Sequence, residues 1–204
     1  MNGVLYISYD GILEPLGQSQ VLVYLKRLAA DRPIHLVSFE KAEDWAKVAE
    51  RERLVHDIAA SGIVWHPLRY HKRPTALATA WDIACGMRLG LWLVLRHHLR
   101  IVHARSYVAS VMALAIKRIT GIKYLFDMRG FWADEKLDGG WPHDGRMYRL
   151  AKGFERRFLL AADHVVSLTH AAITEMQRFP YLQGRMPPVT VIPTCADLAR
   201  FKPM

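Results

Sequence analysis

The sequence has few cysteines, and their scarcity excludes two classes of protein. Cys85 and Cys195 are the only cysteines among 204 residues, and they lie far apart. Secreted domains held by disulfides carry several pairs, and structural zinc sites need closely spaced Cys or His ligands. The ten histidines show no such spacing. We therefore expect no disulfide framework, no zinc site and a reducing, cytoplasmic compartment.

Signatures of several nucleotide-binding enzymes are also absent. The dinucleotide fingerprint Gly-x-Gly-x-x-Gly and the phosphate loop that ends in Gly-Lys-Ser/Thr do not occur. The sequence contains no Asp-x-Asp pair that could clamp a metal-bound nucleotide. These absences disfavour a nicotinamide enzyme and a P-loop enzyme, and we expect neither a cofactor nor a metal.

The sequence shows no N-terminal targeting pattern and no long apolar run. The first residues carry neither a basic region nor a small-residue cleavage site, so we expect no signal peptide. The most apolar stretch, residues 83–95, is too short to cross a bilayer, and Arg88 interrupts it. We predict that it belongs to a buried helix.

The composition is that of a globular protein with an excess of positive charge. Hydrophobic residues make up 51% and charged residues 23% of the chain, which argues against disorder. The formal net charge is +9 and the pI is near 9.8. Such a balance favours anionic partners: nucleic acid, acidic lipid or phosphorylated small molecules.

Short apolar runs alternate with helical patterns along the whole chain, which is typical of a parallel sheet. Strands are expected at 4–8, 34–39, 63–65, 101–104, 122–126, 164–168 and 189–192, and helices at 18–30, 42–60, 75–98, 106–120, 146–161 and 169–179. This pattern predicts an α/β fold with a doubly wound, mostly parallel Rossmann-like sheet, helices on both faces and a single domain. Ligands of such sheets bind beyond the carboxyl ends of the strands.

The first loop after a strand ends in Gly17-Gln18-Ser19, at the predicted start of a helix. Free backbone N–H groups and the helix dipole suit such a position to a phosphate. A plain strand-to-helix turn with Ser19 as the cap explains the same residues. Both interpretations stay open.

Two further loops carry charged and aromatic residues. Arg105 follows a strand and could grip a phosphate or carboxylate, or pair with a nearby acid, while Tyr107 could stack on a sugar. The segment 127–135 (DMRGFWADE) holds acids, a cation and two aromatic residues directly after another strand. We favour a binding role for this segment over an internal salt bridge with Trp132 in the core.

Two basic stretches stand apart from these loops. Four cations lie near one face of the helix predicted at 146–161; they are Arg146, Arg149, Lys152 and Arg156. A basic amphipathic helix can rest on anionic lipid, but we favour a solvated cationic face opposite a core-packed one. The second stretch is Arg69, His71, Lys72 and Arg73, which forms an electrostatic patch or a solvated loop.

Three segments of the sequence, taken in their order and spacing, resemble segments of a known protein family. The first is 17–25 (GQSQVLVYL), followed by 37–40 (VSFE); the second is 101–107 (IVHARSY) with 124–132 (YLFDMRGFW); the third is 191–203 (VIPTCADLARFKP). Together they resemble the N-terminal domain of retaining glycosyltransferases of family 4, which have the GT-B fold.

The resemblance implies that residues 1–190 form the acceptor-side half of a GT-B fold, and that residues 191–204 lead into a C-terminal donor domain absent from this chain. In the family that second domain binds the nucleotide-sugar and carries a Glu-x7-Glu pair, which the sequence lacks. The implied reaction is a metal-independent, retaining transfer of a sugar to a saccharide or lipid-linked acceptor, as in polysaccharide biosynthesis. The chain alone is then expected to be inactive.

The residue patterns and the resemblance together give the candidate site. Its members are the catalytic candidates Asp127 and Arg129, the donor-phosphate candidates Gly17, Gln18 and Ser19, and the acceptor-binding candidates Tyr9, Asp10, Arg105, Tyr107, Trp132 and Asp134. Many relatives carry His where this chain has Arg129, Asp where it has Gly130, and Asn-Gly in place of Thr194-Cys195. An arginine stays protonated, so Arg129 could neutralise phosphate but could not act as a general base.

Two other functions fit part of the same pattern. The positive charge allows a non-catalytic α/β module that binds anionic lipid or nucleic acid, and the architecture allows half of a nucleotide-sugar epimerase. No recognised nucleic-acid-binding module supports a nucleic-acid partner. We therefore expect a nucleotide-sugar donor, a saccharide or lipid-linked acceptor, no nucleic acid, and a cytoplasmic location with peripheral contact to the inner face of an anionic membrane.

Overall fold

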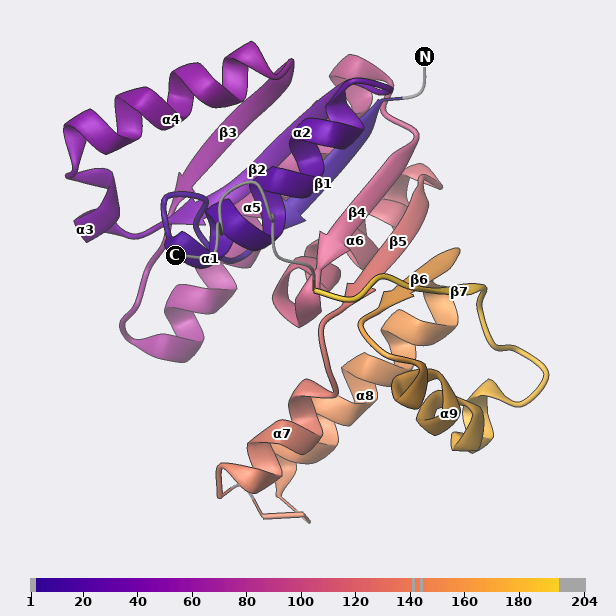
Figure 1. Cartoon of the computed structure of the whole chain (residues 1–204). Helices are drawn as coiled ribbons and strands as arrows, with labels where there is room; N and C mark the ends of the chain where they lie inside the picture. The colour runs from indigo at the N-terminus through magenta and orange to yellow at the C-terminus, as the bar shows by residue number, and fades with distance from the viewer. Residues whose placement is uncertain (1–2, 141, 144, 195–204) are drawn as a thin grey trace, which may run out of the picture.

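Seven parallel strands form one sheet in the part of the chain that the structure describes (Figure 1). The computed structural model describes residues 3–140, 142–143 and 145–194. The strands, in chain order, are β1 (Val4–Ser8), β2 (Ile34–Glu40), β3 (Ile63–Arg69), β4 (Ile101–Arg105), β5 (Lys123–Met128), β6 (His164–Ser167) and β7 (Val189–Val191). Their spatial order is β3-β2-β1-β4-β5-β6-β7, and every neighbouring pair is parallel. The predicted Rossmann-like class is confirmed, with an all-parallel sheet.

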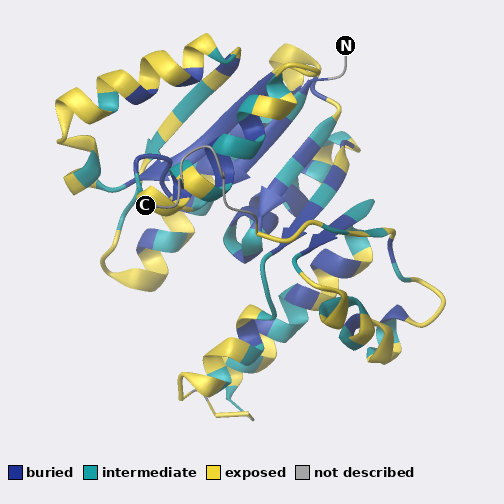
Figure 2. Cartoon of the chain, in the orientation of Figure 1, coloured by how far each residue is buried: buried dark blue, intermediate teal, exposed yellow. Residues whose placement is uncertain are grey.

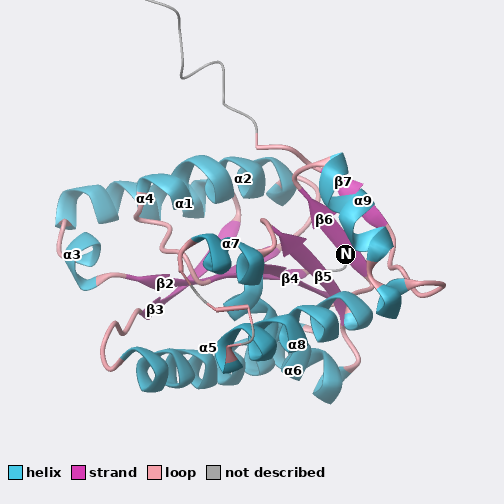
Figure 3. Cartoon of the chain, turned by 90° about the horizontal axis from the view of Figure 1, so that it is seen from below, coloured by secondary structure: helices cyan, strands magenta, loops and turns pink. Residues whose placement is uncertain are grey.

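Helices cover both faces of this sheet. The described helices are α1 (Pro15–Gly17), the π-helix η1 (Gln18–Leu22), α2 (Val23–Ala29), α3 (Ala42–Trp45), α4 (Val48–Ala60), α5 (Thr75–His97), α6 (Ser106–Thr120), α7 (Trp132–Asp138), α8 (Arg146–Ala161), α9 (His170–Arg178) and the 3-10 helix η2 (Pro180–Leu182). α2 and α4 lie on one side of the sheet, and α5, α6 and α8 on the other (Figure 3). The domain is therefore doubly wound.

The strand order reverses between β1 and β4, since the chain first winds from β1 to β3 and then crosses to β4. Such a switch point opens a crevice at the carboxyl ends of the strands, where ligands of α/β sheets bind. The strand arrows point downward in Figure 1, so Figure 3, seen from below, looks onto this edge, with α7 standing in front of it. The candidate functional site lies here.

The structure differs from the sequence pattern at four boundaries. The first helix begins at Pro15, because proline suits the first helical position. The helix expected over 42–60 is interrupted between Trp45 and Val48. β3 continues through Pro67, which an edge strand tolerates because a missing N–H costs it no ladder bond. The loop expected after β5 contains the helix α7.

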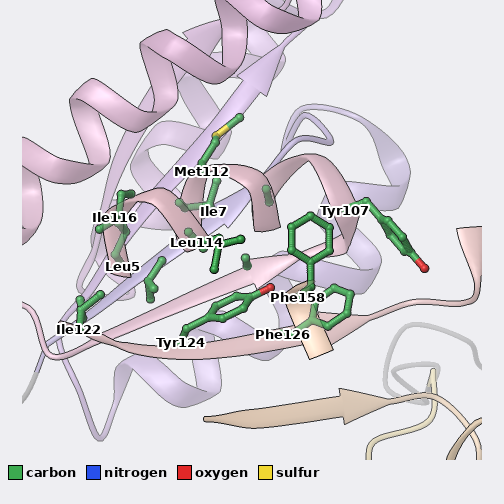
Figure 4. Packing of buried hydrophobic residues seen from close by; sticks show 14 of the residues in the cluster. Leu5, Ile7, Tyr107, Met112, Leu114, Ile116, Ile122, Tyr124, Phe126 and Phe158 are labelled. Atoms are coloured by element: carbon green, nitrogen blue, oxygen red, sulfur yellow. The ribbon is translucent and has the colours of Figure 1, made fainter. Parts of the chain in front are cut away.

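The hydrophobic core fills both faces of the sheet, whose central strands are almost wholly buried (Figure 2). On the face under α6 and α8, the rings of Tyr107, Phe126 and Phe158 lie together (Figure 4). Their centroids are separated by 5.7–6.0 Å, within the range of favourable aromatic pairs. This cluster fixes the first turn of α6 and the end of β5 directly beneath the site.

Among the described residues, α5 is the one helix long and apolar enough to cross a membrane by length and composition. Its inner side packs closely on the fold, since a Cβ on Gly90 would lie 2.7 Å from Ile116 Cδ1. Its outer side carries four large apolar residues with exposures of 55–71%; these are Leu77, Trp81, Trp92 and Leu95. The helix predicted to be buried is therefore buried on one side only.

Candidate functional site

The register of the central strands brings four polar side chains together at the switch point. Tyr6 of β1 lies beside His103 of β4, and Arg105 lies beside Asp127 of β5. Residues in register on neighbouring parallel strands point to the same face, as do residues two apart on one strand. These four residues therefore share the face covered by α2. The Tyr6 and His103 rings confirm this placement, with centroids 4.4 Å apart.

Asp127 is the centre of this group, which we call the Asp127 cluster and which comprises Asp127, His103, Arg105, Arg129 and Gln20. Its Oδ2 lies 3.7 Å from Nη1 of Arg105 and 3.7 Å from Nε2 of His103, and its Oδ1 lies 3.8 Å from Nη1 of Arg129. Burial alone raises the pKa of Asp127, but the neighbouring His103, Arg129 and Arg105 hold that pKa below its ordinary value. The carboxylate is therefore ionised at neutral pH.

The cluster is not closed by direct hydrogen bonds. Asp127 Oδ1, His103 Nε2 and Arg105 Nε are buried without a hydrogen-bond partner. Buried polar atoms in folded proteins are nearly always satisfied by protein or by ordered water. The spacing of about 3.7 Å around Asp127 thus suits a cluster that completes its contacts through water or a ligand atom.

Gln20 joins the two arginines of the cluster. Its side-chain oxygen accepts a hydrogen bond from Nη2 of Arg105 at 3.0 Å and another from Nη2 of Arg129 at 3.1 Å. Arg129 also donates to Oγ1 of Thr194 at 3.0 Å. Desolvation and the nearby Arg105 both lower the pKa of Arg129. Two guanidinium groups share the Asp127 carboxylate, so these five residues carry a net positive charge, which the half-exposed Asp10 beside Arg105 offsets in part.

The two arginines differ in exposure, which separates their roles. The side chain of Arg105 is 4% exposed and that of Arg129 is 22% exposed. Arg105 is held by Gln20, by Asp127 and by Asp10, whose Oδ2 lies 3.6 Å from its Nε. Arg129 is accordingly the cation through which the cluster can meet a ligand, and Arg105 supports it from inside the fold.

Tyr9 and Asp10 follow β1 but face different partners. The Asp10 side chain is half exposed and approaches Arg105, so it belongs at the rim of the Asp127 cluster. The Tyr9 hydroxyl donates to Oδ2 of the buried Asp82 at 3.0 Å, and its ring packs on Phe39. Burial raises the pKa of Tyr9, and the neighbouring Asp82 raises it further. Tyr9 thus connects the first loop to α5.

The three donor-phosphate candidates lie within a helix, and not before it. Gly17 is helical, and a Cβ there would lie 2.0 Å from the carbonyl oxygen of Gly11, so this glycine allows close packing of the helix on the first loop. The Ser19 hydroxyl donates to the carbonyl of Pro15 at 2.8 Å, and the side-chain Nε2 of Gln18 donates to the carbonyl of Leu13 at 3.1 Å. The alternative of Ser19 as a helix cap is therefore wrong.

A buried glutamate shapes this first loop. The carboxylate of Glu40, at the end of β2, accepts from the backbone N–H of Ile12 at 2.8 Å and of Leu13 at 3.1 Å, and from the Ser38 hydroxyl at 2.6 Å. Burial raises the pKa of Glu40 in spite of these three bonds. The loop between Asp10 and α1 is therefore preformed, and its shape does not wait for a ligand.

Tyr107, Trp132 and Asp134 meet in a second group beside α8. Tyr107 is buried, and its hydroxyl donates to Glu155 Oε2 at 2.5 Å. Lys152 bridges Glu155 at 2.5 Å and Asp134 at 2.9 Å. Burial raises the pKa of Glu155, whereas Lys152 and Tyr107 oppose that rise. Tyr107 is thus part of the core, and this placement does not support the predicted stacking of its ring on a sugar.

The open side of this second group is a cleft of about 810 Å³ between the loops that follow β5 and β6. Arg129, Asp134 and Glu135 line one side of it, and Thr169 and Glu175 line the other. Trp132 is 36% exposed at the start of α7, and Lys136 lies 5.6 Å from its ring centroid. Trp132 does not line the cleft itself, whose aromatic lining residues are Phe131 and Tyr148. The cleft therefore brings a cation from the Asp127 cluster together with acids and with aromatic rings suited to a sugar.

The sequence patterns did not assign roles to several residues that hold the site. Asp82 is the only acidic residue of the apolar helix α5, and that isolation could have indicated a buried partner. Gln20 and His103 lie inside the segments that carried the resemblance, but nothing local indicated their contacts. Among the described residues no group of three or more His, Cys, Asp or Glu side chains is placed to hold a metal ion. The part of the third segment that follows Thr194 lies outside the described residues.

Comparison with known proteins gives one family and a set of similar folds. The family model of Glycosyltransferase Family 4 matches residues 16–200. No curated protein matches the chain. Among solved structures, sucrose-phosphate synthase from Thermosynechococcus elongatus superposes with a TM-score of 0.62 at 11% identity, over 100% of this chain and 51% of that one.

Two further structures were solved with ligands. A ugt transferase from Siraitia grosvenorii in complex with UDP has a TM-score of 0.60 at 11% identity, over 94% of this chain and 51% of that one. Anabaena HepE in complex with UDP and glucose has a TM-score of 0.56 at 14% identity, over 100% of this chain and 47% of that one. At such identities the likeness concerns the fold, which is half of a GT-B architecture. The chain spans about half the length of these structures.

Proposed function

The chain belongs to Glycosyltransferase Family 4, and from this premise we propose that it is the acceptor-binding half of a glycosyltransferase. The observation that carries the proposal is the Asp127 cluster, a positively charged group at the switch point of the sheet with Arg129 at its surface. A donor domain would face this edge and bind the nucleotide-sugar. Solved structures that contain the same fold over about half of their length support that division.

The proposed chemistry is electrostatic. Transfer of a sugar from a nucleotide-sugar leaves a diphosphate, and a fixed cation stabilises that charge as it develops. Arg129 would supply the cation, with Asp127 and Gln20 holding its guanidinium in place. The transfer would need no metal and would retain the anomeric configuration, and the chain without a donor domain would bind acceptor but transfer no sugar.

The acceptor would lie in the cleft beside α7. Asp134 offers a carboxylate for hydroxyl groups within the cleft, and Trp132, at the start of α7 and 36% exposed, offers an aromatic surface next to it for a sugar ring. Asp10 would add a second carboxylate at the rim of the cluster. These residues suit a saccharide or a lipid-linked saccharide.

Radiolabelled nucleotide-sugars, offered to the full natural polypeptide with a mixture of saccharide and lipid-linked acceptors, test the proposal. The Arg129→Gln variant should lose about 100-fold in kcat/KM, the effect typical of removing one transition-state donor. Arg185→Gln removes an exposed arginine from a loop and is the matched control. Equal activity in the two variants would contradict the proposed role of Arg129, and formation of free sugar isomers without a glycoside would indicate an epimerase.

We further infer that the protein is cytoplasmic and touches an anionic membrane with the face formed by α5 and α8. Both helices lie on the same side of the sheet (Figure 3). α5 exposes Trp81 and Trp92, while α8 exposes Met147 and Leu150 between arginines. Aromatic and cationic residues of this kind are favoured where a protein meets lipid headgroups.

Co-sedimentation with phosphatidylglycerol vesicles tests this contact. The double variant Trp81→Ala/Trp92→Ala should bind the vesicles markedly less than the wild type, and added salt should weaken binding of the wild type. Trp45→Ala, which removes an exposed tryptophan from α3, is the control. Undiminished binding by the double variant would remove this face from consideration.

A further inference from the structure

A second hollow at the carboxyl edge of the sheet lies beside the edge strand β3, away from the Asp127 cluster. It has a volume of about 510 Å³ and is formed by the segment after β3 and the start of α3. We call it the β3 pocket; its lining residues are Lys41, Ala42, Glu43, Arg69, Tyr70, His71, Lys72 and Arg73. Four of these are Lys or Arg, and only Glu43 is acidic. The pocket is therefore strongly cationic.

Most of this charge is uncompensated. Lys41 pairs with Glu14 at 2.7 Å, but Arg69, Lys72 and Arg73 form no ion pair with any described residue. Like charges held close together repel one another, and a fold gains nothing by gathering them around a hollow. An anion within the hollow would convert that repulsion into attraction.

Two hydrogen bonds fix the backbone of the pocket. The N–H of Tyr70 donates to the carbonyl of Glu40 at 2.9 Å, and the N–H of His71 donates to Oδ2 of Asp82 at 3.0 Å. Asp82 is 1% exposed, so this anchor lies inside the fold. The loop after β3 is thus preorganised, which lowers the entropic cost of binding a ligand there.

The same carboxylate orients the ring of His71. Oδ1 of Asp82 lies 2.6 Å from Nδ1 of His71, whose side chain is 38% exposed. A carboxylate at Nδ1 places the ring proton there and fixes the ring plane, which leaves Nε2 as a hydrogen-bond acceptor for a hydroxyl of a ligand. His71 can therefore give a directed contact among cations that act mainly through charge.

The β3 pocket is connected to the Asp127 cluster through two adjacent residues. Tyr9 donates to Asp82 on the pocket side, and Asp10 approaches Arg105 on the cluster side. One bound molecule could therefore place a charged group in the β3 pocket and direct a hydroxyl toward the cluster. The pocket at β3 and the cleft at α7 lie on opposite sides of the cluster along this edge of the sheet, so an acceptor that occupies both would pass the cluster.

We propose that the β3 pocket binds a phosphate or diphosphate group of the acceptor. Arg69, Lys72 and Arg73 hold the phosphate oxygens, and Nε2 of His71 accepts a hydrogen bond from a P–OH or sugar hydroxyl of the same molecule. Guanidinium and ammonium groups are the side chains that bind phosphate best. The proposal rests on the proposed function, since it specifies the acceptor as a phosphorylated molecule. The phosphate belongs either to a soluble sugar phosphate or to a lipid headgroup.

Titration calorimetry with inorganic pyrophosphate tests the pocket without any turnover. The double variant Arg69→Gln/Arg73→Gln should bind pyrophosphate at least about tenfold more weakly than the wild type, since each charged hydrogen bond contributes more than a neutral one. The matched control is Arg32→Gln/Arg100→Gln, which removes the same charge from two exposed positions at the opposite end of the sheet. His71→Gln should weaken binding by a smaller factor.

Two calorimetric results would overturn the proposal: equal pyrophosphate affinity in the pocket and control variants, or loss of binding in Arg129→Gln alone. Vesicle co-sedimentation separates the two sources of phosphate. If the pocket variant also loses binding to phosphatidylglycerol vesicles, the phosphate is a lipid headgroup; if only pyrophosphate binding falls, it belongs to a soluble ester. If the pocket variant transfers sugar with an unchanged acceptor KM, the phosphate site is contradicted while the proposed function stands. If the protein binds pyrophosphate in the pocket but transfers no sugar, the proposed function is contradicted while the phosphate site stands.

Discussion

Arg105 and Asp127 face each other at the ends of β4 and β5, with Nη1 and Oδ2 3.7 Å apart and both side chains less than a tenth exposed. A buried ion pair at this distance makes no hydrogen bond of its own. Its members depend on Gln20, Arg129 and His103 for the rest of their contacts. The pair therefore helps to hold the site together. Replacing either residue should also alter the contacts of Gln20, Arg129 and His103.

Removing the carboxylate should destabilise the fold strongly. Asp127→Ala leaves Arg105 buried with no adjacent acid except the half-exposed Asp10, and uncompensated buried charges cost about 3–5 kcal/mol. Urea denaturation measures the free energy of unfolding. Asp138→Asn, at an exposed position of α7, should change it by less than about 0.5 kcal/mol. Similar stability in the two variants would show that Asp127 does not balance the arginines.

The same Gly→Ala change should have opposite effects in two helices. At Gly17 the new methyl carbon would lie 2.0 Å from the carbonyl oxygen of Gly11. Gly17→Ala should therefore lower the free energy of unfolding by about 1–3 kcal/mol. At Gly153, in α8, nothing lies within 4 Å, and alanine is the better helix former by about 1 kcal/mol. Thermal and urea unfolding of both variants check the prediction. An unchanged stability of Gly17→Ala would rule out the close contact with the first loop.

Stability should fall on mild acidification because of a buried histidine. Burial, with His97 and His66 nearby, lowers the pKa of His35 to about 4, whereas the unfolded chain takes up this proton near pH 6.5. Between these values the unfolded state binds more protons, so stability decreases as the pH falls from about 6.5 towards 4.

Replacing this histidine should weaken the pH dependence. His35→Leu cannot bind the proton in either state, so its unfolding free energy should decrease less than that of the wild type over the same range. Urea denaturation at pH steps from 7 to 4.5 measures the difference. The exposed His170→Asn variant is the control and should follow the wild type. Parallel curves for His35→Leu and the wild type would exclude His35 as the source.

Two tyrosine hydroxyls donate hydrogen bonds to carboxylates, and they should contribute different amounts to the free energy of unfolding. Tyr107→Phe leaves the buried Glu155 without one of its donors, at a cost of about 1–3 kcal/mol. Tyr148→Phe removes a bond to Asp134, whose side chain is 41% exposed and can turn to water, so its cost should stay below about 0.5 kcal/mol. Urea denaturation of both variants compares them. Equal costs would contradict the structural role assigned to Tyr107.

Much of the fold could be predicted from local patterns. The apolar runs and helical spacing located all seven strands, and the expected bounds of α6 and α8 agree with the structure. The alternation also placed the functional loops at the carboxyl ends of the strands, where Arg105, Asp127 and Arg129 do come together. These features follow from the sequence because secondary structure and parallel topology depend mainly on periodicity and on helix and strand boundaries.

The tertiary structure alone decided which of those residues are available to a ligand. Gln20 meets Arg105 and Arg129, which lie 85 and 109 positions further along the chain, and no local pattern reports such a contact. Tyr107 lies in the first turn of a predicted helix and was expected to stack on a sugar, yet the aromatic cluster and Glu155 hold it inside the fold. Sequence sets the order of the elements, whereas burial and partner choice depend on packing between elements that are distant in the chain.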